Sequence, residues 1–187
     1  MKIAIYWEQQ DVGGVETHLL TLLKNWPEKN DEIVLFSHVN DPAFKRIAND
    51  LAELGYVQNV SFNLVSFSSY LQKIKKVPFY NFFKLLGYIC KPLFFLKGIY
   101  NCRKLFNKFG HFDAILSDNG CYPGASGCLA AIIAAKKSNI KKRMLLIHHE
   151  ATKPEIFWGT FEHIIDRLIC RSATDIVAVS QATRKTI

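Results

Sequence analysis

Acidic residues are missing from a long central stretch of this chain. Between Glu53 and Asp113 there is no Asp or Glu, whereas the same stretch holds nine lysines and arginines. The chain of 187 residues has a formal net charge of +8, so this one segment accounts for its basic character. A basic balance of this kind points to anionic partners, either a membrane surface or nucleic acid.

Paired cysteines and a leader segment are also missing. The five cysteines are an odd number without a Cys-x-x-Cys pair, and Met1 is followed at once by an apolar segment. These absences argue against a disulfide framework, a structural zinc site and secretion, and they predict a cytoplasmic protein. The cysteines are predicted to be small buried hydrophobes rather than nucleophiles: Cys90, Cys102, Cys121, Cys128 and Cys170.

Strand-like and helix-like periods alternate along the chain, which predicts an α/β fold with a mostly parallel sheet. Strands are predicted at 2–7, 32–37, 60–67, 113–117, 143–148 and 175–179, and helices at 15–26, from 41, at 125–137 and at 157–171. Asp41 and Ser180 are the expected N-caps of two helices. The chain stops about two turns after Ser180, so we expect residues 1–187 to be one domain of a longer polypeptide.

A paired-glycine turn connects the first predicted strand to the first helix. Gly13 and Gly14 lie just before Val15, where the helical pattern begins. Such a turn permits positive φ and close approach of a ligand, and the helix N-terminus favours a phosphate or carboxylate. The chain has no P-loop, and no acid ends the second strand, so NAD binding is disfavoured. A plain tight turn remains the alternative.

Polar residues follow several of the other predicted strands, where ligands of open α/β sheets bind. They are Asp118, Asn119 and Tyr122 after the fourth strand, His148, His149 and Glu150 after the fifth, and Ser180 after the sixth. Adjacent strand residues point to opposite faces, so only one histidine is expected in a cleft. His149 is favoured because the strand has ended there. A metal site is not predicted because the ligand spacing is missing, and capping or packing roles for both histidines remain open.

The segment 70–109 mixes lysines with large apolar residues. Lys84, Lys91, Lys97 and Pro92 interrupt its apolar run, which disfavours a membrane-spanning helix. The spacing predicts two short amphipathic helices that lie in a membrane interface, with lysines on one side. The alternative is that the apolar side packs on the sheet and the lysines are solvated. Nucleic-acid binding is disfavoured because no accompanying motif is present.

Four stretches, in the same order and spacing, resemble glycosyltransferase family 4, a set of retaining enzymes with the GT-B fold. They are the glycine turn with its helix (13–20), the strand 113–117 with its loop and alanine-rich helix, the His149-Glu150 turn, and residues 173–184. The resemblance implies a doubly wound, Rossmann-like domain that forms the acceptor-side half of a GT-B enzyme. The nucleotide-sugar domain with its paired glutamates is absent, so we expect this chain alone to be inactive.

The resemblance also implies roles for individual residues. The donor phosphate and sugar would meet Gly13, Gly14 and Ser180, and the transferred sugar would meet His149 or His148. The acceptor would meet Glu16, Asp118, Asn119 and Tyr122. The expected partners are a nucleotide-sugar and a glycan or lipid-linked acceptor, with no metal, no other cofactor and no nucleic acid.

Lys84, Lys91, Lys97 and Lys104 are predicted to dock the domain peripherally on the anionic inner face of the membrane. The alternative function, from another class, is a non-catalytic binding module or half-enzyme that needs a partner subunit. Both functions predict an acceptor cleft, but only a transferase needs a nucleotide-sugar domain downstream.

Overall fold

A computed structural model describes residues 1–9, 13–38, 42–63, 67–120, 122–151 and 159–186. Six strands form one sheet in the order β3-β2-β1-β4-β5-β6, and every neighbouring pair is parallel. The strands are β1 (Lys2–Glu8), β2 (Glu32–His38), β3 (Val57–Phe62), β4 (Ala114–Asn119), β5 (Lys142–Ile147) and β6 (Asp175–Ala178). The predicted α/β class and parallel sheet are therefore confirmed.

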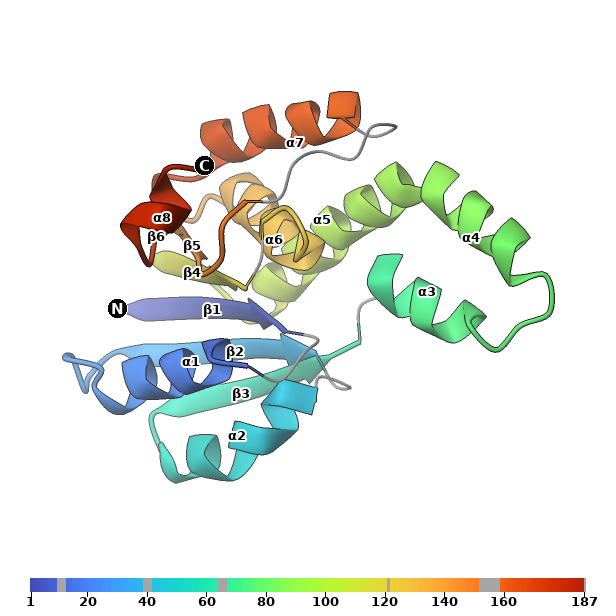
Figure 1. The fold of residues 1–187 in the computed structure, drawn as a ribbon. Coiled ribbons are helices and arrows are strands. Elements are labelled where there is room, and N and C mark those ends of the chain that lie inside the picture. Colours follow the sequence, from blue (N-terminus) through green and yellow to red (C-terminus); the bar gives the residue numbers. More distant parts are fainter. Residues whose placement is uncertain (10–12, 39–41, 64–66, 121, 152–158, 187) are drawn as a thin grey trace.

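Helices cover both faces of this sheet (Figure 1). They are α1 (Val15–Lys24), α2 (Pro42–Glu53), α3 (Phe67–Ile74), α4 (Tyr80–Ile89), α5 (Lys91–Lys108), α6 (Ser126–Lys137), α7 (Gly159–Ser172) and α8 (Gln181–Arg184). The side chains of β1 alternate between two apolar cores. Ile5 packs with Leu19 of α1, whereas Tyr6 packs in the core that contains Phe106 of α5 and Ile132 of α6. The molecule is therefore a three-layer, doubly wound domain.

The third strand differs from its prediction. It was expected at 60–67 and lies at Val57–Phe62, whereas Phe67 begins α3. The strand is parallel to β2, and the register ends where His38 pairs with Phe62, at the last residue of β2. The partner strand, rather than the local apolar pattern, therefore fixes the end of β3.

Two residues singled out in the sequence, Pro92 and Ser180, lie at the starts of helices. Pro92 lies in the first turn of α5, where a missing N–H costs nothing, so this proline starts a helix. Ser180 is the N-cap of α8, and its hydroxyl accepts a hydrogen bond from the Thr183 N–H at 3.0 Å. The predicted N-cap Asp41 lies outside the described residues.

Candidate active site

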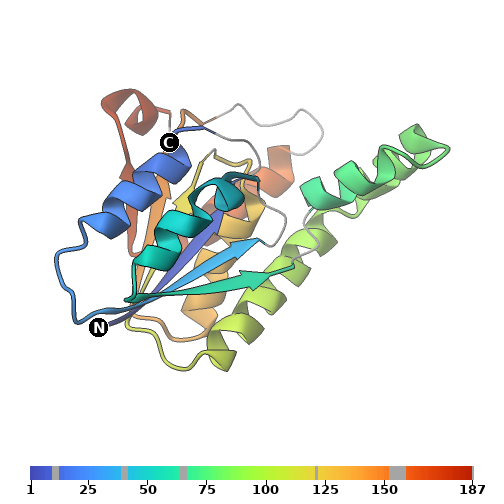
Figure 2. The ribbon, with the colours of Figure 1, turned by 90° about the horizontal axis from the view of Figure 1, so that it is seen from below.

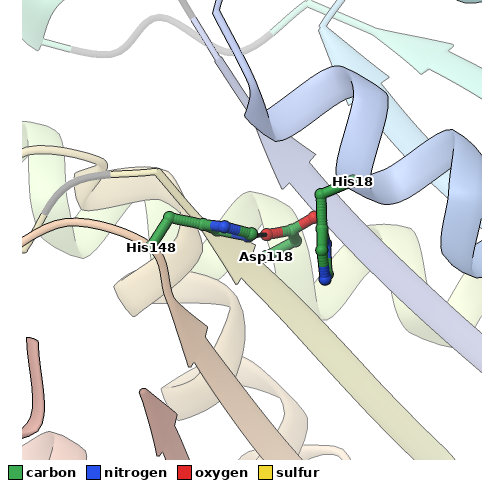
Figure 3. A group of neighbouring side chains, drawn as sticks. All are labelled: His18, Asp118 and His148. Atoms are coloured by element: carbon green, nitrogen blue, oxygen red, sulfur yellow. Dashed lines mark hydrogen bonds and ion pairs between the residues drawn. The ribbon is translucent and has the colours of Figure 1, made fainter. Parts of the chain in front are cut away.

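Three polar side chains from separate elements meet at the carboxyl edge of the sheet (Figure 3). Asp118 comes from β4, His148 directly follows β5, and His18 is the fourth residue of α1. The Nε2 atom of His148 lies 2.6 Å from Oδ1 of Asp118, which is hydrogen-bond distance. The rings of His18 and His148 meet edge to face, with centroids 4.7 Å apart. We call these three residues the His–Asp–His cluster.

Strand alternation explains why these residues meet. Leu116 and Leu146 belong to the core beneath α1 and α2. Asp118 and His148 follow them by two positions and therefore project to the same side of the sheet. His149 is exposed and lies outside the cluster, although the sequence favoured it over His148.

Asp118 is an unusual residue for this position because its carboxylate is fully buried. His148 is the hydrogen-bond partner of Oδ1, and Oδ2 is buried without any such partner among the described residues. Buried carboxylates are normally satisfied by several donors, since leaving one unpaired costs free energy. One oxygen of this carboxylate therefore has hydrogen-bonding capacity that the described residues leave unused.

The cluster also offers the right atom types for a metal ion, which the sequence did not predict. One donor atom from each residue lies within 4.8 Å of the others. Two ligands on one Zn²⁺ at about 2.0–2.2 Å would be separated by about 3.3 Å in tetrahedral geometry. The 2.6 Å separation of Asp118 and His148 is shorter than this and fits a shared proton. The contact is thus that of a hydrogen-bonded pair.

The glycine turn has a different geometry from the predicted one. The turn does not use the positive φ that its glycines permit: Gly14 has φ of −89°, and Gly110 is the positive-φ glycine of the described residues. A Cβ on Gly14 would meet no atom within 4 Å, and one on Gly13 would lie 3.9 Å from Gln9. Neither backbone conformation nor packing therefore requires glycine at these positions. The absence of side chains leaves the backbone accessible to a ligand.

A side chain of the chain itself occupies the N-terminus of α1. The carboxylate of Glu16 accepts the Gly13 N–H at 3.0 and 3.1 Å and pairs with Arg46 at 3.2 Å. Glu16 is fully buried, so the residue predicted to bind the acceptor has an internal role here. At α6 the Glu8 carboxylate similarly accepts the Gly127 N–H at 2.9 Å. Both helix N-termini thus hold a carboxylate, which the helix dipole stabilises.

The other predicted acceptor residues lie on the opposite side of the sheet. Asn119 is fully buried and follows Asp118 directly, so it projects toward α6. The Tyr122 hydroxyl donates a hydrogen bond to Asp166 of α7. Burial and this carboxylate raise the pKa of Tyr122 far above its ordinary value, so the hydroxyl stays protonated. Tyr122 and Asp166 line a cavity of about 260 Å³ beside α7.

The predicted membrane lysines do not share one environment. Lys97 and Lys104 are exposed on α5, and Lys84 is half-buried with its Nζ 5.8 Å from the Tyr80 ring centroid. Lys91 instead pairs with the buried carboxylate of Glu162 at 3.4 Å. Its charge is therefore used inside the protein rather than on the surface.

Sequence reasoning gave no role to His18, which is the third member of the cluster. The signal was present in the helical period, because His18 lies three residues after Val15 and one before Leu19, both of which are buried. A polar residue at the edge of a buried helix face, one turn after a glycine turn, faces the strand ends.

The strand order and the cluster at the carboxyl edge define a Rossmann-like domain with a candidate ligand site beside its central strands. The family model described as Glycosyltransferase Family 4 matches residues 12–187. The chain therefore belongs to glycosyltransferase family 4. No curated protein sequence matches it.

Solved structures with similar folds are glycosyltransferases of the GT-B type. HepE of Anabaena, in complex with UDP and glucose, matches with a TM-score of 0.53 and 18% identity over 100% of this chain and 40% of that chain. The lipopolysaccharide outer core galactosyltransferase WaaB matches with a TM-score of 0.51 and 20% identity. The match covers 100% of this chain and 41% of WaaB. MurG of Acinetobacter baumannii matches with a TM-score of 0.56 and 11% identity. The match covers 98% of this chain and 43% of MurG. This chain has the fold of one GT-B half and spans less than half the length of these proteins.

Proposed function

We propose that this chain is the acceptor-side domain of a retaining glycosyltransferase. The enzyme transfers a sugar from a nucleotide-diphosphate sugar to a glycan or lipid-linked acceptor, without a metal ion or other cofactor. The family membership supports the reaction class. In the longer protein, a second domain would hold most of the nucleotide. The free thiols are compatible with a cytoplasmic location, and the basic segment with peripheral attachment to the membrane.

The observation that carries this proposal is the open glycine backbone beside the cluster. Gly14 needs neither positive φ nor space for its neighbours. Its carbonyl accepts the backbone N–H of His18, so it lies one helical turn from the cluster. A glycine without a structural requirement, placed at a helix N-terminus next to polar side chains, is suited to close approach of a phosphate or sugar.

The proposed roles follow from this arrangement. Gly13, Gly14 and Ser180 contact the donor phosphate and sugar, and a phosphate that used the Gly13 N–H would replace the Glu16 carboxylate there. His148 forms a hydrogen bond with the transferred sugar, and Asp118 holds the imidazole ring in position. His149 is the alternative contact of the transferred sugar. The family resemblance further implies that Glu16, Asn119 and Tyr122 help to bind the acceptor.

In the transfer step, the bond between the anomeric carbon and the donor phosphate oxygen breaks. A bond between that carbon and the acceptor hydroxyl oxygen forms on the same face, so the configuration is retained. The hydroxyl proton passes to the departing phosphate oxygen. The protein supplies position and hydrogen bonds, and it exchanges no electrons with the substrates.

The test compares two glycine substitutions of equal chemistry. Gly55, like Gly14, has no atom within 4 Å of an added Cβ, but it lies between α2 and β3. In the longer protein, G14A is expected to lower nucleoside-diphosphate release from UDP- and GDP-sugars at least ten-fold, whereas G55A leaves it unchanged. Thermal midpoints of both variants should stay within a few degrees of the parent.

Equal activity of G14A and G55A would contradict the role of the open backbone. NMR of the product reports its anomeric configuration, and an inverted configuration would contradict the retaining mechanism. A longer protein that releases no nucleoside diphosphate from any of these donors would favour the half-enzyme alternative.

A further inference from the structure

Helical segments project beyond the carboxyl edge of the sheet, away from the layered body (Figure 2). We call residues 67–100 the helical arm: α3, α4 and the first half of α5. Its inner side is well packed, because the Phe67 ring meets the rings of Tyr88 and Phe94, with centroids 5.1 and 6.2 Å away. The Tyr70 hydroxyl donates to the Phe83 carbonyl at 2.8 Å, and Tyr70 lies where a Cβ on Gly87 would be. The arm therefore has a definite structure.

The outer side of the arm is apolar and uncovered. Seven large side chains are 43–67% exposed and follow one another at helical spacing through α4 and α5. They form what we call the apolar stripe: Phe82, Leu85, Leu86, Ile89, Leu93, Leu96 and Tyr100. Phe79, at the tip, is 81% exposed and has φ of 63°. A contiguous exposed apolar surface of this kind marks a site of interaction.

The sequence left two arrangements of this segment open, amphipathic helices in a membrane interface or an apolar side packed on the sheet. Burial of one apolar side against the sheet was one alternative, and α5 does bury Phe95, Ile99 and Cys102. The apolar residues, however, occupy two sides of the same helix, and the second side has no structural use within the described residues. Burial in the core therefore accounts for only part of the apolar content of α5.

The acid-free segment that contains the stripe also carries exposed positive charge. Seven lysines and arginines of the acid-free segment are exposed: Lys73, Lys75, Lys76, Lys97, Arg103, Lys104 and Lys108. Lys97 follows Leu93 by four residues, and Lys104 follows Tyr100 by four, so both continue the line of the stripe. A partner that covers the stripe therefore meets a field of one sign and is expected to be anionic.

We propose that the apolar stripe inserts into the interfacial region of an anionic lipid membrane, with the exposed lysines against the headgroups. Amphipathic helices with bulky apolar residues and flanking lysines bind in this way, parallel to the surface. No helix of the described residues is long and apolar enough to cross a membrane. The arm extends from the carboxyl edge of the sheet, which is the edge that carries the His–Asp–His cluster.

This inference adds the stripe to the proposed function and names the lipid surface from which a lipid-linked acceptor would be reached. The docking itself does not require sugar transfer. A binding measurement with vesicles contains no nucleotide-sugar, so failure of the docking and failure of the transferase function are separately detectable.

The experiment is flotation of the full chain with phosphatidylcholine vesicles, with and without about 30% phosphatidylglycerol. The I89Q/L93Q variant removes two stripe residues that are 63% and 64% exposed. The matched control is I164Q/L168Q on α7, which has the same spacing and exposures of 50% and 38%. The parent and the control are expected to float with the anionic vesicles, and I89Q/L93Q is expected to bind at least ten-fold more weakly.

Charge is tested by K97Q/K104Q against K137Q/K141Q, whose lysines are also exposed but lie at the end of α6 and before β5. A lysine near an anionic leaflet contributes a factor of about five in binding, so the first variant should lose about 25-fold. The second should bind as the parent does. Higher salt should weaken the parent and leave K97Q/K104Q less affected.

Three outcomes would overturn the proposal. The first is failure of the parent to float with either kind of vesicle. The second is an equal loss of binding in I89Q/L93Q and in its control, I164Q/L168Q. The third is a concentration-dependent dimer in sedimentation that I89Q/L93Q dissociates while vesicle binding is unchanged, which would assign the stripe to a second copy of the chain. Circular dichroism of each variant establishes that the helices are retained.

Discussion

Replacing His148 by alanine removes the hydrogen-bond partner of a fully buried carboxylate. Asp118 is 0% exposed, and the His148 side chain is 9% exposed, so water reaches neither freely. The Oδ2 atom of Asp118 already lacks a hydrogen-bond partner among the described residues. In the H148A variant, neither carboxylate oxygen has a side-chain partner. We therefore expect the free energy of unfolding to fall by more than a side-chain truncation alone would cause.

The magnitude follows from the burial of the pair. Leaving a buried carboxylate without its hydrogen-bond partner costs about 3 kcal/mol or more, because the group stays desolvated. The D118N variant keeps an oxygen that can accept from His148 and removes the charge, so its cost is expected to be below about 1 kcal/mol. In H148A/D118N no buried charge is left, and the cost should fall to about 1–2 kcal/mol. The interaction free energy of the cycle is then about 2 kcal/mol or more.

Urea unfolding of the four proteins, followed by circular dichroism, measures this cycle. The slope of the free energy against urea should be the same for all four, which shows that each unfolds to a similar state. Additive costs for H148A and D118N would refute the reasoning, as would an H148A variant that loses less than about 1 kcal/mol. Either result would mean that water or a rearranged neighbour satisfies the carboxylate.

Three further predictions concern other parts of the molecule. G127A should lose about 1–3 kcal/mol of stability in urea unfolding, although alanine usually favours a helix, because its Cβ would overlap the Glu8 carboxylate and the Tyr6 hydroxyl; unchanged stability would contradict the close packing. A maleimide reagent at pH 7 should label exposed Cys170 and leave Cys102 unlabelled until urea unfolds the chain, since burial raises the pKa of Cys102 to about 12. The Met1 amino group and the Trp26 indole lower the pKa of Asp31, so its stabilisation is present above the ordinary carboxyl pKa of about 3.9 and is lost as the pH falls through the lower folded value. D31N should therefore flatten the acid limb of a stability–pH curve, and an unaltered limb would argue against this pair.

The sequence was sufficient for the sheet because each strand is a short apolar run with a clear boundary. Residues 2–7 and 32–37 were predicted as strands, and the structure extends each by one residue. Both are buried on two sides, so local composition and tertiary position agree. The edge strand β3 was misplaced because only its neighbour determines where pairing stops, and no local residue pattern records that neighbour.

The site was predictable only to the level of strand ends. Asp118 and a histidine of the 148–149 pair were identified because polar residues after parallel strands gather at one edge. The partnership of Asp118 with His148 depends on the phase of two strands, which a shift of one residue reverses. The internal use of Glu16 and Lys91 depends on Arg46 and Glu162, which are distant in sequence. Such pairs follow from the packing of helices, which the residue pattern leaves open.

The last two residues of β4 lie on opposite sides of the sheet. Asp118 belongs to the space under α1, together with His18 and His148, whereas Asn119 belongs to the side of α6 and α7. Two consecutive residues therefore belong to two separate regions, one on each side of the sheet, and substitutions in one region need not affect the other. A mutational scan along this strand should give effects that alternate in kind, not effects that fade with distance along the chain. These residues should therefore be grouped by the side of the sheet on which they lie, and not by their proximity in sequence.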